Sequence, residues 1–339
     1  MNRPVPLVTT LAAGLLALTA CGGSSNADAV ADDGSVDLSK VTLVVGDQKG
    51  GSEALLTASG DLDEAEYDIE FKPFTSGPPL LEAVSSGAVD VGGVGNTPPL
   101  FAIDQDKDLK IVSANDQGAT GDAIIVPRGS RATSVAQLKG KKIAVAKGSS
   151  ANYNLVAQLE DAGLTLDDVE PVWLQPTEGL AAFRGGSVDA WAIWDPFTSQ
   201  AELGSDARVL SDGAGLVNGL GFQVASDDAL DDEATRAAIE DYLGRLASAQ
   251  TWAADHKAEW SAAWAKETGL PREVTDRATT RRAYAPIPID AQVVASEQEM
   301  WDAFAAQGQV SGDPDLGKYF VTDFNDAVAK AAAEQKAAS

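Results

Sequence analysis

Two corners of the chain combine a lysine, a glycine and a serine just before an expected helix. They read Lys49-Gly50-Gly51-Ser52 and Lys147-Gly148-Ser149-Ser150, and each follows an apolar run typical of a strand. Glycine lets a ligand approach the backbone closely, serine adds a hydroxyl donor, and a helix N-terminus leaves N–H groups unpaired. Such a corner suits a small oxyanion, whereas a single corner is more simply explained as an ordinary helix cap.

These corners belong to an internal repeat. Residues 80–90 read LLEAVSSGAVD and residues 179–189 read GLAAFRGGSVD, so the same glycine, valine and aspartate recur 99 positions apart. The two lysine corners lie upstream of these motifs and recur 98 positions apart. Further on, Asn96 matches Asp195, and a proline soon follows each of them, as at a capped helix start. Four matches in order, at nearly constant spacing, predict two similar lobes.

The elements that must position the corners alternate between strands and helices. We expect strands at residues 41–45, 67–71, 88–91, 109–113 and 123–126, and helices at residues 52–59, 80–84 and from 98 onward. This order predicts an α/β fold in which each lobe is a doubly wound, mainly parallel sheet. Ligands of such sheets bind beyond the carboxyl ends of the strands, where Thr75-Ser76-Gly77-Pro78 and Asn96-Thr97 join the two corners. The matched corners therefore predict one cleft shared by two lobes.

The lobe boundaries follow from the repeat. We expect a first lobe over residues 41–126, a second lobe over residues 127–222, and a return to the first lobe over residues 223–330. The two crossings between the lobes form a two-strand hinge, which permits closure about the cleft. After the return, amphipathic helices expected at 232–254, 255–267, 271–283 and 291–306 cover the first lobe.

Charge and residue counts exclude several kinds of function. The chain of 339 residues has a formal net charge of −26, which disfavours nucleic acid and anionic lipid surfaces as partners. One cysteine and one histidine exclude a Cys/His zinc site, a Cys–His nucleophile pair and a disulfide framework. Asp104, Asp106 and Asp108 alternate, but the glycine and glutamate of a twelve-residue calcium loop are absent. We therefore expect no metal and no cofactor.

The first twenty residues are typical of an export signal. An apolar run from Val5 to Leu18 is long enough for a signal core and too short to span a bilayer. It ends in Leu-Thr-Ala-Cys-Gly, which resembles the lipobox of bacterial lipoproteins. We predict a lipoprotein signal peptide over residues 1–20, diacylation of Cys21 and a flexible tether over residues 21–40, with an ordinary secretory signal as the alternative.

Four strings resemble a known family. They are GDQKGG (46–51), FTSGPPLLEAVSSGAVDVGGVGNTPP (74–99), VAKGSSANYNLVAQLEDAGL (145–164) and AAFRGGSVDAWAIWDPF (181–197), and they are similar to the aliphatic sulfonate-binding proteins, the solute-binding subunits of ABC importers. The resemblance covers about residues 41–300 and implies a two-lobed type II periplasmic-binding-protein fold without catalysis. The residues that it implies as lining the site are Gln48, Lys49, Gly50, Ser76, Gly77, Asn96, Thr97, Gly148, Ser149, Ser150, Trp194, Asp195 and Arg282.

Several aromatic and charged residues have alternative roles. Arg282, ahead of a proline-containing segment, matches an arginine of the family, with Arg281 as the register alternative. Trp194 either stacks on an organic tail of the ligand or packs in the core. Asp195 either caps its helix, orients its neighbours or meets an ammonium such as that of taurine. The residues expected to have only structural roles are Trp191, Trp252, Trp260, Trp264 and His256.

The resemblance implies a transport function outside the cytoplasm. We expect a monomeric lipoprotein, anchored by lipid to the outer face of the cell membrane, that binds an alkanesulfonate and delivers it to an ABC permease and its ATPase. Taurine, nitrate and a pyrimidine-type vitamin precursor are alternative ligands. A sensory lipoprotein without an importer is an alternative role.

Overall fold

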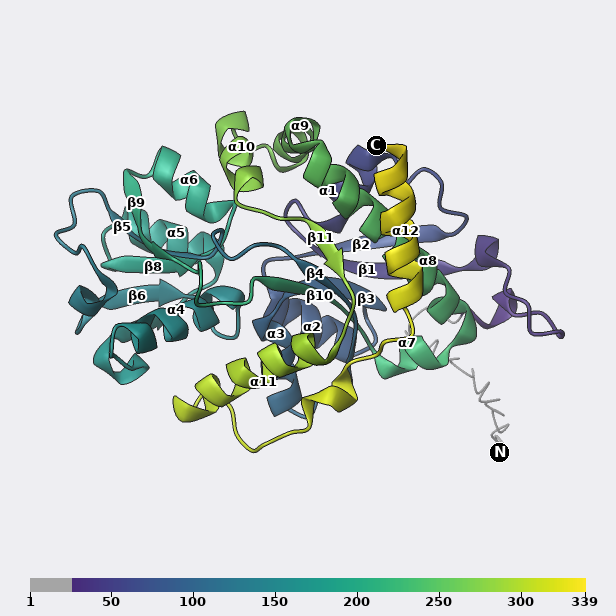
Figure 1. The fold of residues 1–339 in the computed structure, drawn as a ribbon, viewed down its shortest axis with the longest axis horizontal. Helices are drawn as coiled ribbons and strands as arrows, with labels where there is room; N and C mark the ends of the chain where they lie inside the picture. Colours follow the sequence, from purple (N-terminus) through teal and green to yellow (C-terminus); the bar gives the residue numbers. More distant parts are fainter. Residues whose placement is uncertain (1–25) are drawn as a thin grey trace, which may run out of the picture.

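The computed structural model describes residues 26–339, which form two α/β lobes built on two separate sheets. Figure 1 shows the lobes side by side along the longest axis of the molecule, with both ends of the described chain in the same lobe. Residues 1–25, which include the predicted signal peptide and Cys21, lie outside the described residues. Within residues 26–339, no helix combines the length and the apolar character that crossing a membrane requires.

The sheet of the first lobe has six strands in the order β11-β4-β10-β3-β1-β2. The strands are β1 (Thr42–Gln48), β2 (Asp68–Phe74), β3 (Val91–Gly95), β4 (Lys110–Asp116), β10 (Leu220–Ala225) and β11 (Ala285–Ile287). Strands β1, β2 and β3 are parallel, whereas β10 runs antiparallel to its neighbours β3 and β4. The centre of β1 is a continuous apolar run because helices cover both faces of the sheet.

The sheet of the second lobe repeats this plan with five strands in the order β7-β6-β8-β5-β9. The strands are β5 (Ala123–Pro127), β6 (Lys142–Val145), β7 (Glu170–Trp173), β8 (Ala190–Ile193) and β9 (Ala207–Asp212). Three parallel strands are again followed by an inner antiparallel strand, here β5. The predicted α/β fold with two similar lobes is confirmed, although both sheets are mixed because the strand that enters each lobe runs in reverse.

The repeated Gly-x-Val-Asp motif has the same structural role in each lobe. Both of its glycines have positive φ angles, of 69° and 68°. The carboxylate of Asp90 then accepts a hydrogen bond from the backbone N–H of Val44 at 2.7 Å, and Asp189 accepts one from Lys142 at 3.0 Å. Each aspartate therefore ties its own segment to the parallel strand beside it, which explains why the motif occurs twice.

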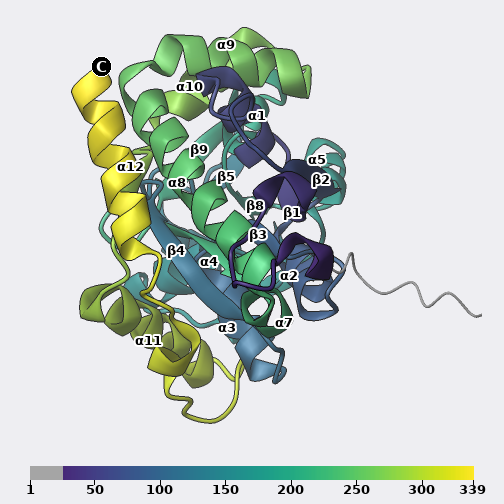
Figure 2. The same ribbon diagram turned by 90° about the vertical axis from the view of Figure 1, so that its right-hand side faces the viewer.

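Helices connect the strands and cover both sheets. Those within the repeat are α1 (Ser52–Ser59), α2 (Gly77–Ser85), α3 (Thr97–Asp104), α4 (Ser150–Asp161), α5 (Pro176–Arg184) and α6 (Phe197–Gly204). After β10 come α7 (Asp227–Asp231), α8 (Glu233–Asp255), α9 (Lys257–Thr268), α10 (Arg272–Thr280), α11 (Ala291–Ala306) and α12 (Asn325–Ala338). The four helices expected after the return are thus confirmed as α8 to α11. Figure 2 shows α8 and α12 packed side by side on the first lobe.

Two segments connect the lobes, residues 117–122 between β4 and β5 and residues 213–219 between β9 and β10. The predicted hinge of two crossings is therefore present. The predicted boundaries after residues 126 and 222, however, each fall inside a strand. The reason is that the strand entering a lobe is also the strand that completes its sheet, so the crossings lie just before β5 and β10.

Residues 26–40, which the sequence assigned to a flexible tether, pack on the first lobe. The amide of Asn26 donates to Thr235 Oγ1 at 2.9 Å and accepts from the backbone N–H of Thr42 at 3.1 Å. The apolar side chains that join the adjacent core are Ala29, Val30, Val36 and Leu38. The predicted tether is therefore wrong for this segment, because the glycine-, serine- and aspartate-rich composition conceals a few well-placed apolar residues.

Candidate functional site

A cleft of about 390 Å³ opens between the lobes, at the ends of their parallel strands. The predicted site residues that line it are Gln48, Lys49, Gly50, Gly77, Ser149, Ser150, Trp194, Asp195 and Arg282. Both lobes contribute to this set, and the two lysine corners face the same space. The four other predicted residues, Ser76, Asn96, Thr97 and Gly148, do not line the cleft.

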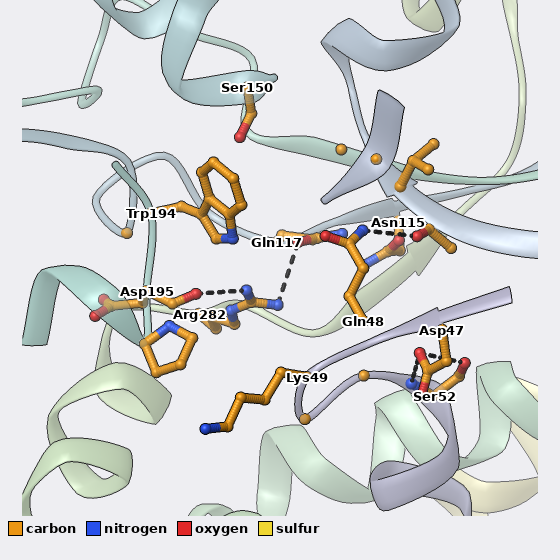
Figure 3. Close-up of a pocket in the computed structure, with 18 of the residues that line it drawn as sticks. Asp47, Gln48, Lys49, Ser52, Asn115, Gln117, Ser150, Trp194, Asp195 and Arg282 are labelled. Carbon is orange, nitrogen blue, oxygen red and sulfur yellow. Dashed lines mark hydrogen bonds between the residues drawn. The ribbon is translucent and has the colours of Figure 1, made fainter. Parts of the chain in front are cut away.

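At the first corner, the donors at the start of α1 already have an acceptor. Asp47 accepts hydrogen bonds from the backbone N–H groups of Ser52 and Glu53, at 2.8 and 3.0 Å, and from the Ser52 hydroxyl at 3.0 Å. A ligand therefore meets the backbone of Gly50 and the side chain of Lys49 rather than these donors. Figure 3 shows Asp47 and Ser52 paired on the far side of the loop from Lys49.

At the second corner, the serine hydroxyls also donate within the protein. Ser149 Oγ donates to the carbonyl of Ala146 at 2.6 Å and accepts from the N–H of Asn152 at 3.3 Å, so it caps α4. Ser150 Oγ donates to a carboxylate oxygen of Asp122 at 2.9 Å. The expectation that these hydroxyls donate to an anion is therefore not met by the geometry, because the Ala146 carbonyl and the Asp122 carboxylate already accept their hydrogen bonds.

Asn96, Thr97 and Gly148 form a layer behind the cleft. Asn96 Nδ2 donates to Asn218 Oδ1 at 2.7 Å, and Thr97 Oγ1 donates to Asn96 Oδ1 at 2.9 Å. Gly148 lies against the ring of Phe101, which a Cβ at this position would approach to 3.2 Å. Asn96 ties the start of α3 to the second crossing, and Gly148 lets the start of α4 pack on α3, so these residues support the wall of the cleft without lining it.

Arg282 supplies a guanidinium to the cleft. It donates to Gln117 Oε1 and to the carbonyl of Asp195, both at 3.2 Å, and its Cζ lies 5.7 Å from the ring centre of Trp264. Figure 3 shows the guanidinium converging with Gln117 and the indole of Trp194 on one space. Among the residues described, no carboxylate lies within ion-pair distance of Arg282. Its charge is thus fixed in place and available to an anion.

Arg281 takes a different direction from its neighbour. Its guanidinium contacts Glu202 Oε2 at 2.6 Å and Asp195 Oδ2 at 3.4 Å. Both acids belong to the second lobe, at the start and within α6, so Arg281 ties that lobe to the segment after α10. Of the two register alternatives, Arg282 therefore lines the cleft and Arg281 holds the lobes together.

Trp194 and Asp195 lie where β8 meets α6. The carboxylate of Asp195 accepts from the N–H and the hydroxyl of Ser199, at 2.9 and 2.6 Å, so it caps α6 in addition to pairing with Arg281. Trp194 packs edge-to-face on Phe197, with ring centres 6.4 Å apart, while its indole also lines the cleft. The capping interpretation of Asp195 fits this geometry, and Trp194 packs on Phe197 while it faces the cleft.

The remaining aromatic residues pack against one another, and one of them also supports a residue of the cleft. Trp191, Trp260 and Trp264 are buried, and Trp260 stacks on Trp264 with ring centres 5.5 Å apart. His256 stacks on Trp252 in the same way, at 5.1 Å. Although these residues pack as predicted, the α9 pair also lies beneath the cleft, where Trp264 supports Arg282.

Sequence reasoning missed several lining residues. They are Asn115, Gln117, Asp122, Gln223 and Tyr284. Asn115 and Gln117 lie at the carboxyl end of β4, where a ligand is expected, but the predicted strand ended at residue 113, three residues before β4 does. Asp122 is a partly buried acid beside Ser150, and desolvation raises its pKa to about 6. Extending the predicted strand to residue 116 would have placed Asn115 and Gln117 at the edge of the sheet where a ligand binds.

Ser76 forms a contact across the mouth of the cleft. Its hydroxyl, at the start of α2, donates to Gln175 Oε1 of the second lobe at 2.8 Å. We expect Ser76→Ala to weaken ligand binding about five-fold, because one neutral hydrogen bond that favours closure contributes about 1 kcal/mol. Isothermal titration calorimetry measures the change. Ser86→Ala, which removes a bond local to α2, serves as the control, and equal affinity in both variants contradicts the closing role.

Comparisons with known proteins agree with this fold. A family model described as "ABC transporter, phosphonate, periplasmic substrate-binding protein" matches residues 62–266. A protein of Escherichia coli (strain K12) named for binding aliphatic sulfonates is 35% identical over 274 residues, which are 80% of this chain and 85% of that protein. The taurine-binding periplasmic protein of the same organism is 30% identical over 149 residues, 44% of this chain and 45% of that protein.

A solved structure gives the same result. The alkanesulfonate-binding protein of Xanthomonas axonopodis pv. citri, bound to MOPS, is 35% identical and superposes with a TM-score of 0.77, covering 83% of this chain and 98% of that one. The predicted resemblance is therefore confirmed. The chain belongs to the periplasmic substrate-binding proteins of ABC transporters, in the family of the aliphatic sulfonate-binding proteins, and is a binding protein rather than an enzyme.

Proposed function

We propose that the chain binds an aliphatic sulfonate in the cleft between its lobes and delivers it to an ABC permease. The names of its relatives describe proteins that bind such compounds. The observation that carries the proposal is Arg282, whose guanidinium faces the cleft and is held by Gln117 and the Asp195 carbonyl. A sulfonate has one negative charge and three acceptor oxygens, so charge-assisted hydrogen bonds suit it to this group.

Neighbouring groups complete an environment for an organic anion. Lys49 of the first lobe and the indole N–H of Trp194 of the second lobe line the same space as Arg282. The rings of Trp194 and Phe74 offer apolar surface to a short alkyl chain. The head group therefore meets donors from both lobes, while the tail meets aromatic surface.

Binding is coupled to closure of the lobes. A ligand that contacts both lobes stabilises the closed arrangement, and the segments 117–122 and 213–219 are the connections about which the lobes rotate. A shift from mostly open to mostly closed requires about 5.5 kcal/mol of differential affinity. Several charge-assisted hydrogen bonds made only in the closed form are of this size.

The same proposal includes a lipid anchor. The sequence around Cys21 supports processing as a lipoprotein on the outer face of the cell membrane, where a monomer passes the ligand to the permease and its ATPase. Mass spectrometry of the mature N-terminus tests the anchor. A diacylated cysteine at position 21 supports it, and an unmodified thiol contradicts it.

Calorimetric titration with ethanesulfonate, propanesulfonate, nitrate and sulfate tests the proposed ligand class. We expect saturable binding of the two sulfonates and much weaker binding of the inorganic anions, because only the sulfonates place an alkyl chain against Trp194 and Phe74. Absence of sulfonate binding to the folded protein contradicts the proposal.

Taurine is a second candidate because an acid lies in the cleft wall. Asp122 is partly buried beside Ser150, and desolvation raises its pKa to about 6, although the Ser150 hydrogen bond and Arg282 lower it. When ionised, Asp122 repels a plain sulfonate but attracts the ammonium group of taurine. The two ligands are therefore expected to respond to pH in opposite directions.

We expect the affinity for ethanesulfonate to fall roughly ten-fold between pH 5 and pH 7.5, as Asp122 ionises, and the affinity for taurine to rise. The free energy of unfolding is expected to change in the same direction. Because the pKa of Asp122 is raised in the folded protein, folding favours the protonated carboxyl. The stability that this group contributes is therefore present below about pH 4 and is lost as pH rises through 6. Titrations at four pH values measure both affinities. Asp122→Asn removes the dependence, while Asp206→Asn, at an exposed ion pair, keeps it; a flat wild-type profile contradicts the role.

A further inference from the structure

Four amide side chains line the wall of the cleft that the first lobe provides. They are Gln48 at the end of β1, Asn115 in β4, Gln117 just after β4 and Gln223 in β10. Figure 3 shows Gln48, Asn115 and Gln117 gathered beside Arg282. We call these four residues the amide wall.

The register of the strands places the amides on one face. Asn115 pairs with Gly221, and Gln223 follows Gly221 by two positions, so both side chains leave the sheet on the same side. Glycines provide the necessary space. A Cβ at Gly221 would lie 1.7 Å from Gln117 Nε2, and one at Gly93 would lie 2.9 Å from Gln223 Nε2. The backbone is therefore built to accommodate these amides.

The hydrogen-bonding capacity of the wall is largely unused by the protein. Gln48 Nε2 donates to a carbonyl of β3 at 3.0 Å, and Gln117 Oε1 accepts from Arg282. Gln223 Oε1 is buried and has no partner among residues 26–339. Asn115, only 8% exposed, lies on the same face of the sheet. Each amide offers one accepting oxygen and one donating NH₂ group to a ligand.

A plain alkanesulfonate does not match this wall. Its oxygens only accept hydrogen bonds, so they pair with amide N–H groups and leave the amide oxygens without a donor. Its alkyl chain pairs with neither group. A desolvated polar group without a partner costs about 1–3 kcal/mol, and sites built from such groups reject analogues that lack the matching group. The wall therefore favours a ligand that brings a donor of its own.

We propose that the amide wall selects sulfonates whose organic part carries a neutral hydrogen-bond donor, such as hydroxyalkanesulfonates, over plain alkanesulfonates of the same length. This inference rests on the proposed function and names the substrate class of the same cleft. The sulfonate group pairs with Arg282, and the hydroxyl donates to Gln223 or Asn115. Because a hydroxyl is uncharged, this preference does not require Asp122 to be ionised.

Matched ligand pairs test the selection by calorimetric titration. The pairs are ethanesulfonate with 2-hydroxyethanesulfonate, and propanesulfonate with 3-hydroxypropanesulfonate. We expect the wild-type protein to bind each hydroxylated member at least ten-fold more tightly. In Gln223→Leu the ratio is expected to fall below three, because the amide oxygen that accepts the ligand hydroxyl is gone. Gln298→Leu, on an exposed face of α11, is the control and keeps the wild-type ratio.

The outcomes separate this inference from the proposed function. Equal affinities within both pairs overturn the selection and leave sulfonate binding intact. Absence of binding for all four compounds overturns the proposed function, and the selection with it. If Gln223→Leu does not fold, Asn115→Leu replaces it, and the wild-type ratios still decide the matter.

Discussion

Replacing Arg282 by methionine is expected to lower the affinity for an alkanesulfonate about a hundred-fold. Two charge-assisted hydrogen bonds to the sulfonate are lost, and a hundred-fold change corresponds to about 2.8 kcal/mol. Methionine keeps an apolar stem over Trp264, so the variant is expected to fold with nearly unchanged stability. Calorimetric titration and urea unfolding measure the two quantities separately.

Two further arginine variants make this result specific. Arg128→Met removes an exposed pair with Asp206 in the second lobe and is expected to bind like the wild type. Arg282→Lys keeps the charge but not the planar fork, so we expect an intermediate loss of about ten-fold. If Arg282→Met binds sulfonate as tightly as Arg128→Met, the guanidinium is not the anion site.

A methyl group at Gly50 is expected to be the most damaging single addition in the first corner. The built Cβ would lie 1.5 Å from Trp264 Nε1, and the φ angle of Gly50 is +71°, which disfavours any L side chain. Because Trp264 is buried and stacked on Trp260, it has little space to retreat. We expect Gly50→Ala to cost about 3–5 kcal/mol of stability and to displace the ring beneath Arg282.

Gly60→Ala separates the two causes of this damage. Gly60 ends α1 with a φ angle of +88°, and a Cβ there meets no atom within 4 Å. The backbone cost alone is therefore expected, about 1–2 kcal/mol, with unchanged ligand affinity. Urea unfolding and calorimetry compare the variants, and similar losses in both would show that contact with Trp264 contributes nothing.

The internal repeat made the architecture predictable. A motif that recurs at nearly constant spacing indicates two copies of one plan, and Asp90 and Asp189 do tie equivalent strands in the two lobes. The position of the cleft followed, because parallel strands direct their carboxyl ends to the same edge. Local patterns failed at β3, whose sequence Val-Gly-Gly-Val-Gly contains three glycines, a residue type that is depleted in strands.

The glycines of β3 have a tertiary explanation that no local pattern contains. A Cβ at Gly92 would lie 2.6 Å from a methyl carbon of Leu80 in α2, one at Gly93 would meet Gln223, and one at Gly95 would meet Ser150 at 3.3 Å. Local sequence patterns are limited in the same way at the site, because they do not show tertiary contacts. Whether a serine at a helix start serves a ligand or its own helix depends on partners such as Asp47 and Ala146, and those contacts are set by the fold.

The guanidinium of Arg282 is also supported by a residue of another helix. The helical spacing of Trp264 in α9 predicts a packing residue, and its side chain is indeed buried. Its ring also lies under the guanidinium of Arg282. Amphipathic periodicity identifies which face of a helix is buried but not what that face touches. Three members of the amide wall, Asn115, Gln117 and Gln223, were not predicted for a related reason, since asparagine and glutamine carry no spacing signature.

The position of β10 makes the two halves of the molecule unequal during biosynthesis. The second lobe is one continuous stretch of chain, complete once β9 has emerged. The first lobe, by contrast, keeps a gap between β3 and β4 that only a strand made about a hundred residues later can fill. The edges of β3 and β4 that face this gap therefore have no partner strand until β10 is made. The sheet of the second lobe can be completed before that of the first, although the first lobe begins earlier in the sequence.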